Sequence, residues 1–352
     1  MMKKALIAMS GGVDSSVAGL LTQQQGFECF GCTMLLRGDV NAETCGSNQD
    51  VVDARSVAER LGMPFHVYDF TTDFKAKVID KFIACYEQGM TPNPCIDCNR
   101  YLKFDRLYDC ADELGCDVVV TGHYARIEKI GEQYYLKKAV DVSKDQSYFL
   151  YHLSAEQLAH TLFPLGELTK SEVRALAEQH GFVNAHKSES QDICFVPDGD
   201  YAQVIEQYTG KQYPCGNFVS PDGKVLGQHR GIIHYTVGQR KGLSIAADQR
   251  LYVRDICPQT NTVCLCTRDE LCQSEATAVD FHWINGVPTA KIFRCHVKIR
   301  YNQKEQPATI QVIDATHVKV KFDEPQRAVT PGQAVVLYQG DTVLGGGLLV
   351  KA

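Results

Sequence analysis

The first third of the chain alternates short apolar runs with longer stretches in which apolar residues recur at helical spacing. The apolar runs, typical of buried strands, cover residues 5–9, 29–36, 64–68 and 118–121. The helical stretches cover residues 14–25, 49–61, 72–88 and 99–114. Strands that alternate with helices in this way predict right-handed crossovers and a mostly parallel sheet. Ligands of such sheets bind beyond the carboxyl ends of the strands.

The pattern changes along the rest of the chain. Residues 124–138 predict a hairpin around Gly131, and Thr169 with Glu172 has the spacing of a capping box that opens a helix to about residue 179. After about Pro197, short alternating segments separated by glycine, proline, asparagine and aspartate dominate. Short strands of this kind indicate a small β-sandwich or barrel at the C-terminus.

A loop rich in glycine and serine follows the first apolar run and precedes a helix. It reads Ser10-Gly11-Gly12-Val13-Asp14-Ser15-Ser16. Glycines permit positive φ and close backbone approach, hydroxyls can donate, and a helix N-terminus attracts phosphate. The loop lacks the lysine of a Walker A motif. It resembles the pyrophosphate loop of the ATP pyrophosphatases, whereas an ordinary strand-to-helix turn, the alternative, would not need this serine and aspartate pattern.

The composition is that of an ordinary globular protein. Its 352 residues suffice for two or three domains, and 44% of them are hydrophobic and 22% charged. No apolar stretch is long enough to cross a bilayer or to form the core of a signal peptide, so we expect a cytoplasmic protein without membrane contact. The formal net charge of −6 argues against a uniformly basic nucleic-acid binder and leaves room for local basic patches.

Two of the fifteen cysteines lie in polar, loop-like surroundings. Cys98 is predicted to lie at the start of a helix with Arg100 and Lys103 nearby, a setting that lowers the pKa of a thiol. Cys194 lies in the polar segment 187–195. Cysteines of a cytoplasmic protein stay mostly reduced, and those in apolar segments are expected to be core residues. These are Cys29, Cys32, Cys110 and Cys116.

Seven short motifs are spread from residue 10 to residue 333. They are the loop at 10–15, Asn93-Pro94 with Cys98-Asn99, Thr121-Gly122-His123-Tyr124, Lys144-Asp145-Gln146-Ser147, Ser190-Gln191-Asp192-Ile193-Cys194-Phe195, Thr236-Val237-Gly238-Gln239-Arg240 and Pro331-Gly332-Gln333. In this order they resemble the motifs of the tRNA-specific 2-thiouridylases. A single tetrapeptide of this kind is weak evidence, whereas the ordered set covers nearly the whole chain.

The resemblance implies ATP-dependent thiolation of the wobble uridine of tRNA at C2. ATP with Mg²⁺ in the loop would adenylate the O2 oxygen and turn it into a leaving group. Cys194 would carry sulfur as a persulfide received from a donor protein. Cys98 would be the nucleophile that releases this sulfur, either by forming a Cys98–Cys194 disulfide or by assisting direct transfer. A thiol reductant would then reset the pair.

The resemblance also implies binding positions for ATP and for tRNA. Those for ATP are Ala8, Met9, Ser10, Gly11, Gly12, Val13, Asp14, Ser15, Met34 and Gly122, with Asp14 supporting magnesium and phosphates. Those for tRNA are Asn93, Pro94, Cys95, His123, Lys144, Asp145, Gln146, Arg300, Tyr301 and Gln333.

One position departs from the family pattern. Many relatives have an aspartate three residues before the nucleophilic cysteine, where this chain has Cys95 with Asp97 close by. Cys95, Cys98 and Cys194 together would supply three thiolates, enough for an iron–sulfur cluster or a zinc ion with one open position. The alternatives are a metal-free persulfide route, which we favour, and a bystander role for Cys95.

Residues 293–301 alternate cations with apolar residues. Arg294, His296, Lys298 and Arg300 take every second position, so a strand would present them in a row and bury its other face. Such a row suits a phosphate backbone, although taken alone a solvated strand face explains it equally well.

We therefore expect an α/β fold in three parts. A parallel-sheet PP-loop ATP pyrophosphatase domain, similar to the adenine nucleotide alpha hydrolases, would span residues 1–200. A small central β-rich domain would span 201–275, and a tRNA-contacting C-terminal β-barrel 276–352. An adenylating synthetase for a small molecule would leave the two cysteines and the basic strand unexplained. A non-catalytic zinc or iron–sulfur RNA-binding protein would leave the phosphate loop unused.

Overall fold

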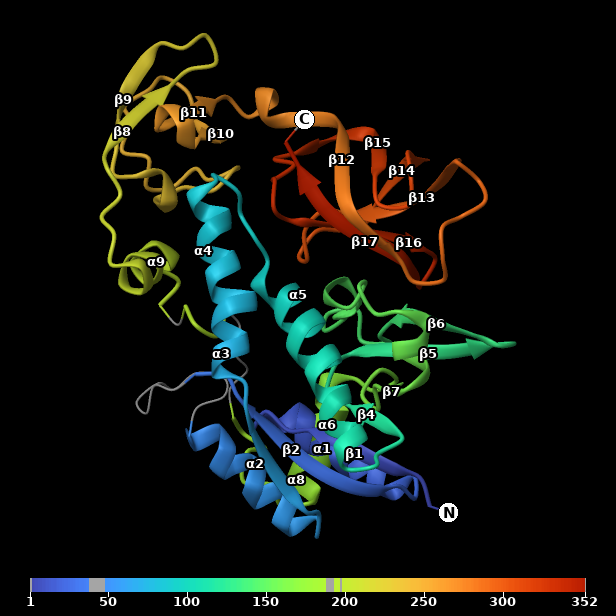
Figure 1. Ribbon diagram of the computed structural model, residues 1–352. Coiled ribbons are helices and arrows are strands. Elements are labelled where there is room, and N and C mark those ends of the chain that lie inside the picture. Colours follow the sequence, from blue (N-terminus) through green and yellow to red (C-terminus); the bar gives the residue numbers. More distant parts are fainter. Residues whose placement is uncertain (1, 38–47, 188–192, 197, 352) are drawn as a thin grey trace.

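The computed structural model describes residues 2–37, 48–187, 193–196 and 198–351 (Figure 1). Its first layer is a five-stranded parallel sheet in the order β3-β2-β1-β4-β7. The strands are β1 (Lys4–Ala8), β2 (Glu28–Leu35), β3 (Phe65–Asp69), β4 (Val118–Val120) and β7 (Thr161–Leu162). The parallel sheet predicted from the apolar runs is confirmed. The pattern missed β7 because this strand has only two residues.

Helices cover both faces of the sheet, because successive side chains of a strand point to opposite sides. On β1, Ala5 and Ile7 join one buried cluster and Leu6 joins the other. The first cluster packs against α1 (Val13–Gln24), α2 (Asn48–Arg60) and α8 (Lys170–Gln179). The second packs against α3 (Thr71–Phe74), α4 (Asp80–Glu87), α5 (Pro94–Cys98) and α6 (Leu107–Glu113). The cysteines expected in the core, at 29, 32, 110 and 116, are all buried.

Two π-helical segments interrupt these helices. Residues 75–79 join α3 to α4, and the π-helical segment η2 (Asn99–Arg106) joins α5 to α6. The helix predicted from residue 99 therefore begins at Pro94, so that prediction was wrong at its N-terminus. Proline suits the first helical position, and the Asn93 side chain caps the helix by accepting a hydrogen bond from the Cys95 N–H at 3.2 Å.

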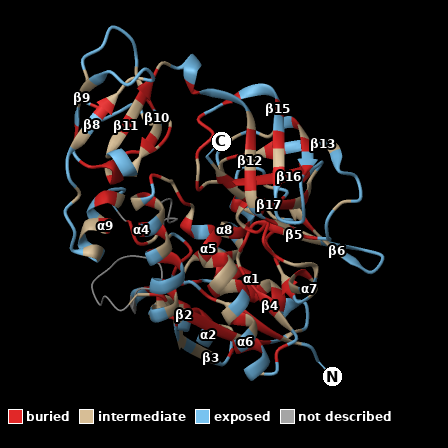
Figure 2. Ribbon diagram, turned by 45° about the horizontal axis from the view of Figure 1, so that its top comes forward, coloured by how far each residue is buried: buried red, intermediate tan, exposed pale blue. Residues whose placement is uncertain are grey.

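Two local predictions are confirmed. Thr169 N-caps α8 in a capping box, and its backbone N–H donates to a Glu172 carboxylate oxygen at 2.7 Å. Strands β5 (Ala125–Ile130) and β6 (Gln133–Lys138) form the hairpin around Gly131, whose tip is exposed (Figure 2). This hairpin extends the C-terminal sheet, since Lys137 pairs with Thr342. The short helix α7 (Ala155–Ala159) follows it along the chain.

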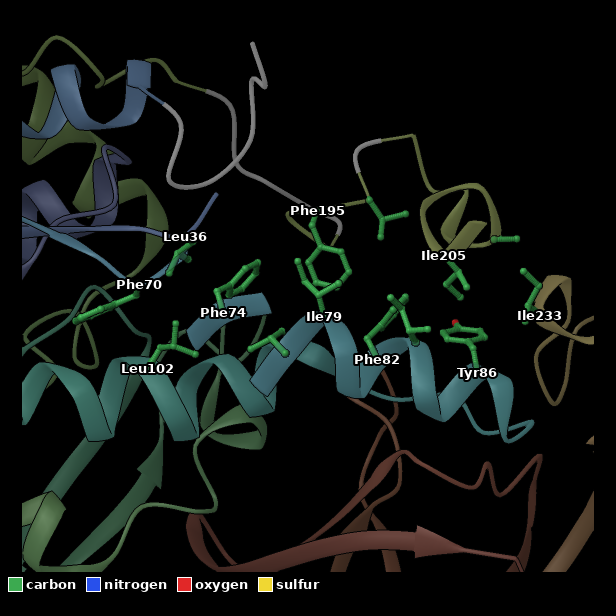
Figure 3. Close-up of a cluster of buried hydrophobic side chains, with 14 of the residues drawn as sticks. Leu36, Phe70, Phe74, Ile79, Phe82, Tyr86, Leu102, Phe195, Ile205 and Ile233 are labelled. Carbon is green, nitrogen blue, oxygen red and sulfur yellow. The ribbon is translucent and has the colours of Figure 1, made fainter. Parts of the chain in front are cut away.

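A four-stranded sheet forms the central part in the order β10-β11-β8-β9. It follows helix α9 (Tyr201–Thr209) and consists of β8 (Gly216–Val219), β9 (Val225–His229), β10 (Tyr252–Cys257) and β11 (Thr262–Cys266). Five of its buried residues, Phe218, Val253, Ile256, Val263 and Leu265, belong to the same cluster as the aromatic face of α4, so the central sheet shares a core with the N-terminal helices. Figure 3 shows part of this cluster, from Leu36 and Phe70 along α4 to Ile205 and Ile233.

The C-terminal strands close into a barrel. They are β12 (Cys272–Trp283), β13 (Ile292–Lys298), β14 (Gln306–Val312), β15 (Val318–Arg327), β16 (Ala334–Gln339) and β17 (Thr342–Val350). The order β12-β15-β14-β13-β16-β17 is completed by pairing of β12 with β17. This closure decides between the sandwich and the barrel that the strand pattern left open.

No helix of the described residues is long and apolar enough to span a membrane.

A buried cluster joins the barrel to the N-terminal part. It combines Ile96 of α5 and Phe104 of η2 with Ala334 and Val336 of β16. His152 lies beside this cluster, with its ring centroid 6.3 Å from that of Phe104. Burial lowers the pKa of its imidazole to about 3, and the charges of Arg100 and His282 act in the same direction.

We expect His152 to make the fold acid-sensitive. The unfolded chain binds a proton at this histidine near pH 6.5, whereas the folded chain does not until about pH 3. The free energy of unfolding therefore falls as the pH drops from 6.5 to about 3, by at most about 1.4 kcal/mol per pH unit. His152→Phe should reduce the fall in melting temperature between pH 6.5 and about pH 4. His186→Gln is the control, because the His186 side chain is 86% exposed. An equal fall in melting temperature in the two variants and the protein without substitutions would contradict the role of His152.

Candidate active site

One cavity of about 290 Å³ collects predicted site residues from distant parts of the chain. From the predicted ATP positions it contains Ala8, Met9, Ser10, Asp14, Ser15, Met34 and Gly122. From the predicted tRNA positions it contains Pro94, Cys95, His123 and Gln146. Cys98 and Cys194 line the same cavity, although they lie 96 positions apart in the sequence.

The remaining predicted positions are not among its lining residues. Two of them, Gly11 and Gly12, lie in the loop between β1 and α1, and Val13 is the first residue of α1. The others lie outside helices and strands and do not line the cavity: Asn93, Lys144, Asp145, Arg300, Tyr301 and Gln333.

The loop after β1 is shaped by its own serines and glycines. Gly11 has φ +72°, and an added Cβ there would lie 2.5 Å from the Asp50 carbonyl oxygen. The Ser10 N–H donates to Ser15 Oγ at 3.1 Å, and Ser15 Oγ donates to the Gly12 carbonyl at 3.0 Å. Gly12 is the N-cap of α1, and no side chain of the described residues caps this helix end. The first N–H groups of α1 therefore have no side-chain cap, and Asp14 and Ser15 of this turn line the cavity, where such groups can bind an anion.

Two residues that the motif did not include support the loop from behind. The Asn184 amide donates to the Gly11 carbonyl at 2.9 Å and to Ser16 Oγ at 3.0 Å. Lys187 Nζ lies 2.8 Å from Asp50 and 2.6 Å from Asp53 of α2, and it donates to the Gly11 carbonyl at 3.5 Å, so it connects the loop to α2. Nothing local in the sequence identifies these residues, because their partners lie more than 130 positions away.

Asp14 is held in an ion pair. Lys170 Nζ lies 2.6 and 2.8 Å from its two oxygens, and the Tyr124 hydroxyl donates to it at 2.9 Å. Lys170 is itself buried, so the pair is partly shielded from water. Because both carboxylate oxygens contact the lysine, Lys170 would compete with a magnesium ion for Asp14.

Residues after β4 line the cavity directly beside the loop. An added Cβ at Gly122 would lie 2.7 Å from the Ser15 nitrogen, so only glycine allows this close contact. The neighbouring His123 is buried, and its Nδ1 lies 2.7 Å from Thr121 Oγ1. Burial lowers the pKa of the His123 imidazole well below its usual value, with Lys103 acting in the same direction. His123 is therefore neutral at physiological pH.

Cys98 occupies a different helical position from the one expected. The sequence predicted it at a helix N-terminus, but it is the last residue of α5, one turn inside the helix that begins at Pro94. Cys95 lies in the first turn instead and is exposed. Asp97 does not reach the cavity, because its buried carboxylate pairs with Lys81 Nζ at 2.6 Å.

Cys194 is positioned by the residue that follows it. The Phe195 ring packs edge-on against Phe74 and Phe82, with centroids 5.9 and 5.1 Å apart (Figure 3). The preceding motif residues 190–192 lie outside the described residues. No disulfide links the cysteines of the described segments, so the Cys98–Cys194 bond expected as one possible product is not present.

The three cysteines do not form a metal site in this arrangement. No group of three histidine, cysteine, aspartate or glutamate side chains within the described residues is placed to hold a metal ion. Cys95, Cys98 and Cys194 share the cavity lining without making such a group.

Several predicted tRNA residues have structural partners. The buried Asp145 carboxylate accepts hydrogen bonds from the N–H groups of Ala139 and Ser147, at 3.1 and 3.2 Å, and from the Ser147 hydroxyl at 2.9 Å. Gln146 Oε1 accepts from the Tyr124 N–H at 3.0 Å, and the backbone N–H of Lys144 donates to the Asp141 carbonyl at 3.0 Å. The segment 144–146 is therefore fixed in shape before any substrate arrives.

Of the three predicted tRNA residues in the C-terminal part, Gln333 and Tyr301 contact the N-terminal part, whereas Arg300 bonds within the C-terminal part. The Gln333 amide donates to the Thr91 carbonyl at 2.8 Å, two residues before the Asn93 cap. Arg300 Nη2 donates to the Arg327 carbonyl at 2.7 Å and to the Ala328 carbonyl. The Tyr301 ring packs on Phe149 with centroids 4.4 Å apart.

The basic strand has the two faces that its alternation predicted. Cys295, Val297 and Ile299 are buried, while Arg294 and His296 are exposed. Two of its cations have acidic neighbours. Arg294 pairs with Asp323 at 2.5 Å, and Lys298 Nζ lies 4.0 Å from Asp145.

Sequence models of three protein families match the chain. The tRNA methyl transferase HUP domain matches residues 3–198, and the tRNA methyl transferase PRC-barrel domain matches residues 202–267. The aminomethyltransferase beta-barrel domain matches residues 273–349.

Curated relatives match the chain over its full length. The tRNA-specific 2-thiouridylase MnmA of Clostridioides difficile (strain 630) is 48% identical, with 100% of this chain and 99% of that protein covered. The protein of the same name from Carboxydothermus hydrogenoformans is 49% identical, with 99% and 98% covered.

Solved structures match more distantly. A 4-thiouridine synthetase in complex with RNA and ATP is 20% identical, with a TM-score of 0.36 and coverage of 58% of this chain and 50% of that one. The NMN synthetase of Francisella tularensis is 21% identical, with a TM-score of 0.36 and coverage of 60% and 79%.

The two loop glycines should respond differently to substitution. Gly11→Ala places a Cβ against the Asp50 backbone at a positive φ, so we expect a loss of about 1–3 kcal/mol in the free energy of unfolding. Gly12→Ala is the matched control, because Gly12 has φ −90° and its added Cβ would find only Ser10 Oγ at 3.5 Å. Thermal denaturation of both variants tests this, and equal melting temperatures would contradict it.

Proposed function

Because the chain belongs to the tRNA-specific 2-thiouridylase family, we propose that its cavity adenylates the wobble uridine of tRNA at O2 and then replaces that oxygen with sulfur. The enzyme is an ATP-dependent tRNA sulfurtransferase. One observation supports placing both steps in this cavity. The phosphate loop, Gly122 and both candidate cysteines line the same space of about 290 Å³.

The nucleotide end of the cavity would bind ATP. The N–H groups at the start of α1 and the Ser10 and Ser15 hydroxyls are donors for the phosphates, and Gly122 leaves room beside Ser15. The Asp14–Lys170 pair would fix the first turn of α1 while the uridine O2 attacks the α-phosphate and pyrophosphate leaves. We propose that Mg²⁺ enters on the triphosphate oxygens, since Lys170 contacts both oxygens of Asp14.

The thiol end would deliver the sulfur. A donor protein would transfer sulfur to Cys194 as a persulfide. The Cys98 thiolate would attack the Cys194 sulfur, forming the Cys98–Cys194 disulfide and releasing hydrosulfide. The hydrosulfide would add at C2 of the adenylated base, and AMP would leave with the former O2 oxygen. Two electrons from a thiol reductant would then restore both cysteines.

A metal-free route suits the arrangement of the cysteines better than a cluster. A site for a zinc ion or an iron–sulfur cluster needs ligands converged on one point, and the described residues form no such group. The mechanism that we propose therefore uses no metal, and Cys95 forms part of the cavity wall without a chemical role.

We propose that tRNA reaches the cavity between the N-terminal part and the barrel. Asn93, Pro94, Cys95, His123 and residues 144–146 would contact the target region, with Arg300, Tyr301 and Gln333 contributing from the barrel. The divisions at 1–200, 201–275 and 276–352 remain part of this proposal. Since the substrate is tRNA, we place the reaction in the cytoplasm.

The first test separates the two chemical steps. We expect Cys98→Ser and Cys194→Ser to abolish formation of 2-thiouridine in a wobble-uridine tRNA, while tRNA-dependent AMP formation from ATP persists. Cys272→Ser, at an exposed cysteine of β12, is the control. Normal thiolation by either active-site variant would contradict the two-cysteine mechanism. AMP formation that needs no tRNA would favour a small-molecule synthetase instead.

The second test concerns Cys95. With a persulfide source and an iron chelator under anaerobic conditions, we expect Cys95→Ser to retain thiolation within about threefold of the unmodified enzyme. The reason is that Cys95 is exposed and belongs to no three-ligand group in the described chain. Activity that appears only after iron is restored, and disappears in Cys95→Ser, would make the three cysteines cluster ligands.

A further inference from the structure

Lys103 and Cys98 line the same cavity. Lys103 is the single lysine or arginine among the described residues that line the cavity. Its charge reaches His123, whose imidazole pKa it helps to lower. Within the described segments Lys103 forms no ion pair, whereas Lys170 pairs with Asp14 and Lys81 with Asp97.

The π-helical turn brings Lys103 to the same face as Cys98. In an α-helix the residue stacked above Cys98 would be Leu102, four positions further along. In η2 the hydrogen bonds run from residue i to i+5, so the fifth residue takes that place. Leu102 is accordingly fully buried in the core, and Lys103 reaches the cavity. Helical side chains lean toward the N-terminus of their helix, which directs Lys103 toward the turn that carries Cys98.

Among the described residues, the charged neighbours of Cys98 along the chain have partners of their own. The helix N-terminus belongs to Cys95, and Arg100 pairs with Asp280 at 2.9 Å. The carboxylate of Asp97 contacts Lys81. The other titratable groups in the described lining are Asp14, Cys32, Cys95, His123 and Cys194. Of these, Asp14 is paired with Lys170 and His123 is neutral, so the positive charge at the thiol end comes from Lys103.

Resting on the proposed function, we propose that Lys103 is the positioning residue that stabilises Cys98 as a thiolate. The Cys98 proton leaves to water, and the positive charge of Lys103 stabilises the thiolate that remains. The thiolate then attacks Cys194, and the same charge stabilises the hydrosulfide that departs. An opposite charge within about 4–6 Å favours the ionised form of an acid by about 1–3 pKa units.

The test measures the Cys98 thiolate directly. The intact enzyme, without tRNA, is alkylated by iodoacetamide across a pH series, and mass spectrometry follows the peptide that contains Cys98. We expect Lys103→Met to slow alkylation of Cys98 at neutral pH by about tenfold or more and to move the pH profile upward. Lys103→Arg should show the same pH dependence of Cys98 alkylation as the enzyme without substitutions. Lys77→Met, at an exposed lysine outside the cavity lining, is the matched control.

Two further readouts separate this inference from the proposed function. Lys103→Met should retain tRNA-dependent AMP formation and lose thiolation. An unchanged Cys98 profile in Lys103→Met would overturn the inference, and loss of AMP formation alongside it would assign Lys103 to the phosphates. If the unmodified enzyme forms no AMP with tRNA, the proposed function fails, while the alkylation profile still decides the role of Lys103.

Discussion

The packing of Phe195 between Phe74 and Phe82 is the contact on which the candidate site depends. Both rings meet Phe195 edge-on, at interplanar angles of 80° and 88°. This geometry favours the electrostatics of aromatic pairs and adds to the burial of a large apolar surface. Because Cys194 is the adjacent residue, the aromatic packing determines where its sulfur lies. The phosphate loop, by contrast, is held by hydrogen bonds among its own residues and by the Asn184 amide.

The same aromatic cluster couples the parts of the molecule. Phe74 and Phe82 belong to the helices on one face of the parallel sheet, and their cluster continues to Ile205 of α9 and Ile233 next to the central sheet. A second cluster joins α5 and η2 to the barrel. The segment that carries Cys95 and Cys98 therefore has packed partners on both sides. A cavity built at such a junction can present reacting groups from several elements while each remains fixed by its own core.

The sequence was sufficient where the signal is local. Apolar runs alternating with helices predicted the parallel sheet, and the Thr169–Glu172 spacing predicted a cap that the structure confirms. The sequence was insufficient where two local signals compete. The apolar periodicity predicted a helix that begins at residue 99, but the helix begins at Pro94, where Asn93 caps it. The basic row on β13 was predicted by its period of two. Its pairing with Asp323 and its proximity to Asp145 were not, because these partners come from distant segments.

The departure at Cys95 changes how charge is distributed in the cavity. A carboxylate at this position would stand in the first turn of α5, where the helix dipole favours an anion. Here the position holds a thiol, and the nearby Asp97 is turned into the protein against Lys81. Among the described lining residues the remaining carboxylate is Asp14, which belongs to the phosphate loop and is paired. The thiol end of the cavity therefore operates with sulfur groups, a neutral histidine and one lysine, and the nucleotide end keeps the acidic group.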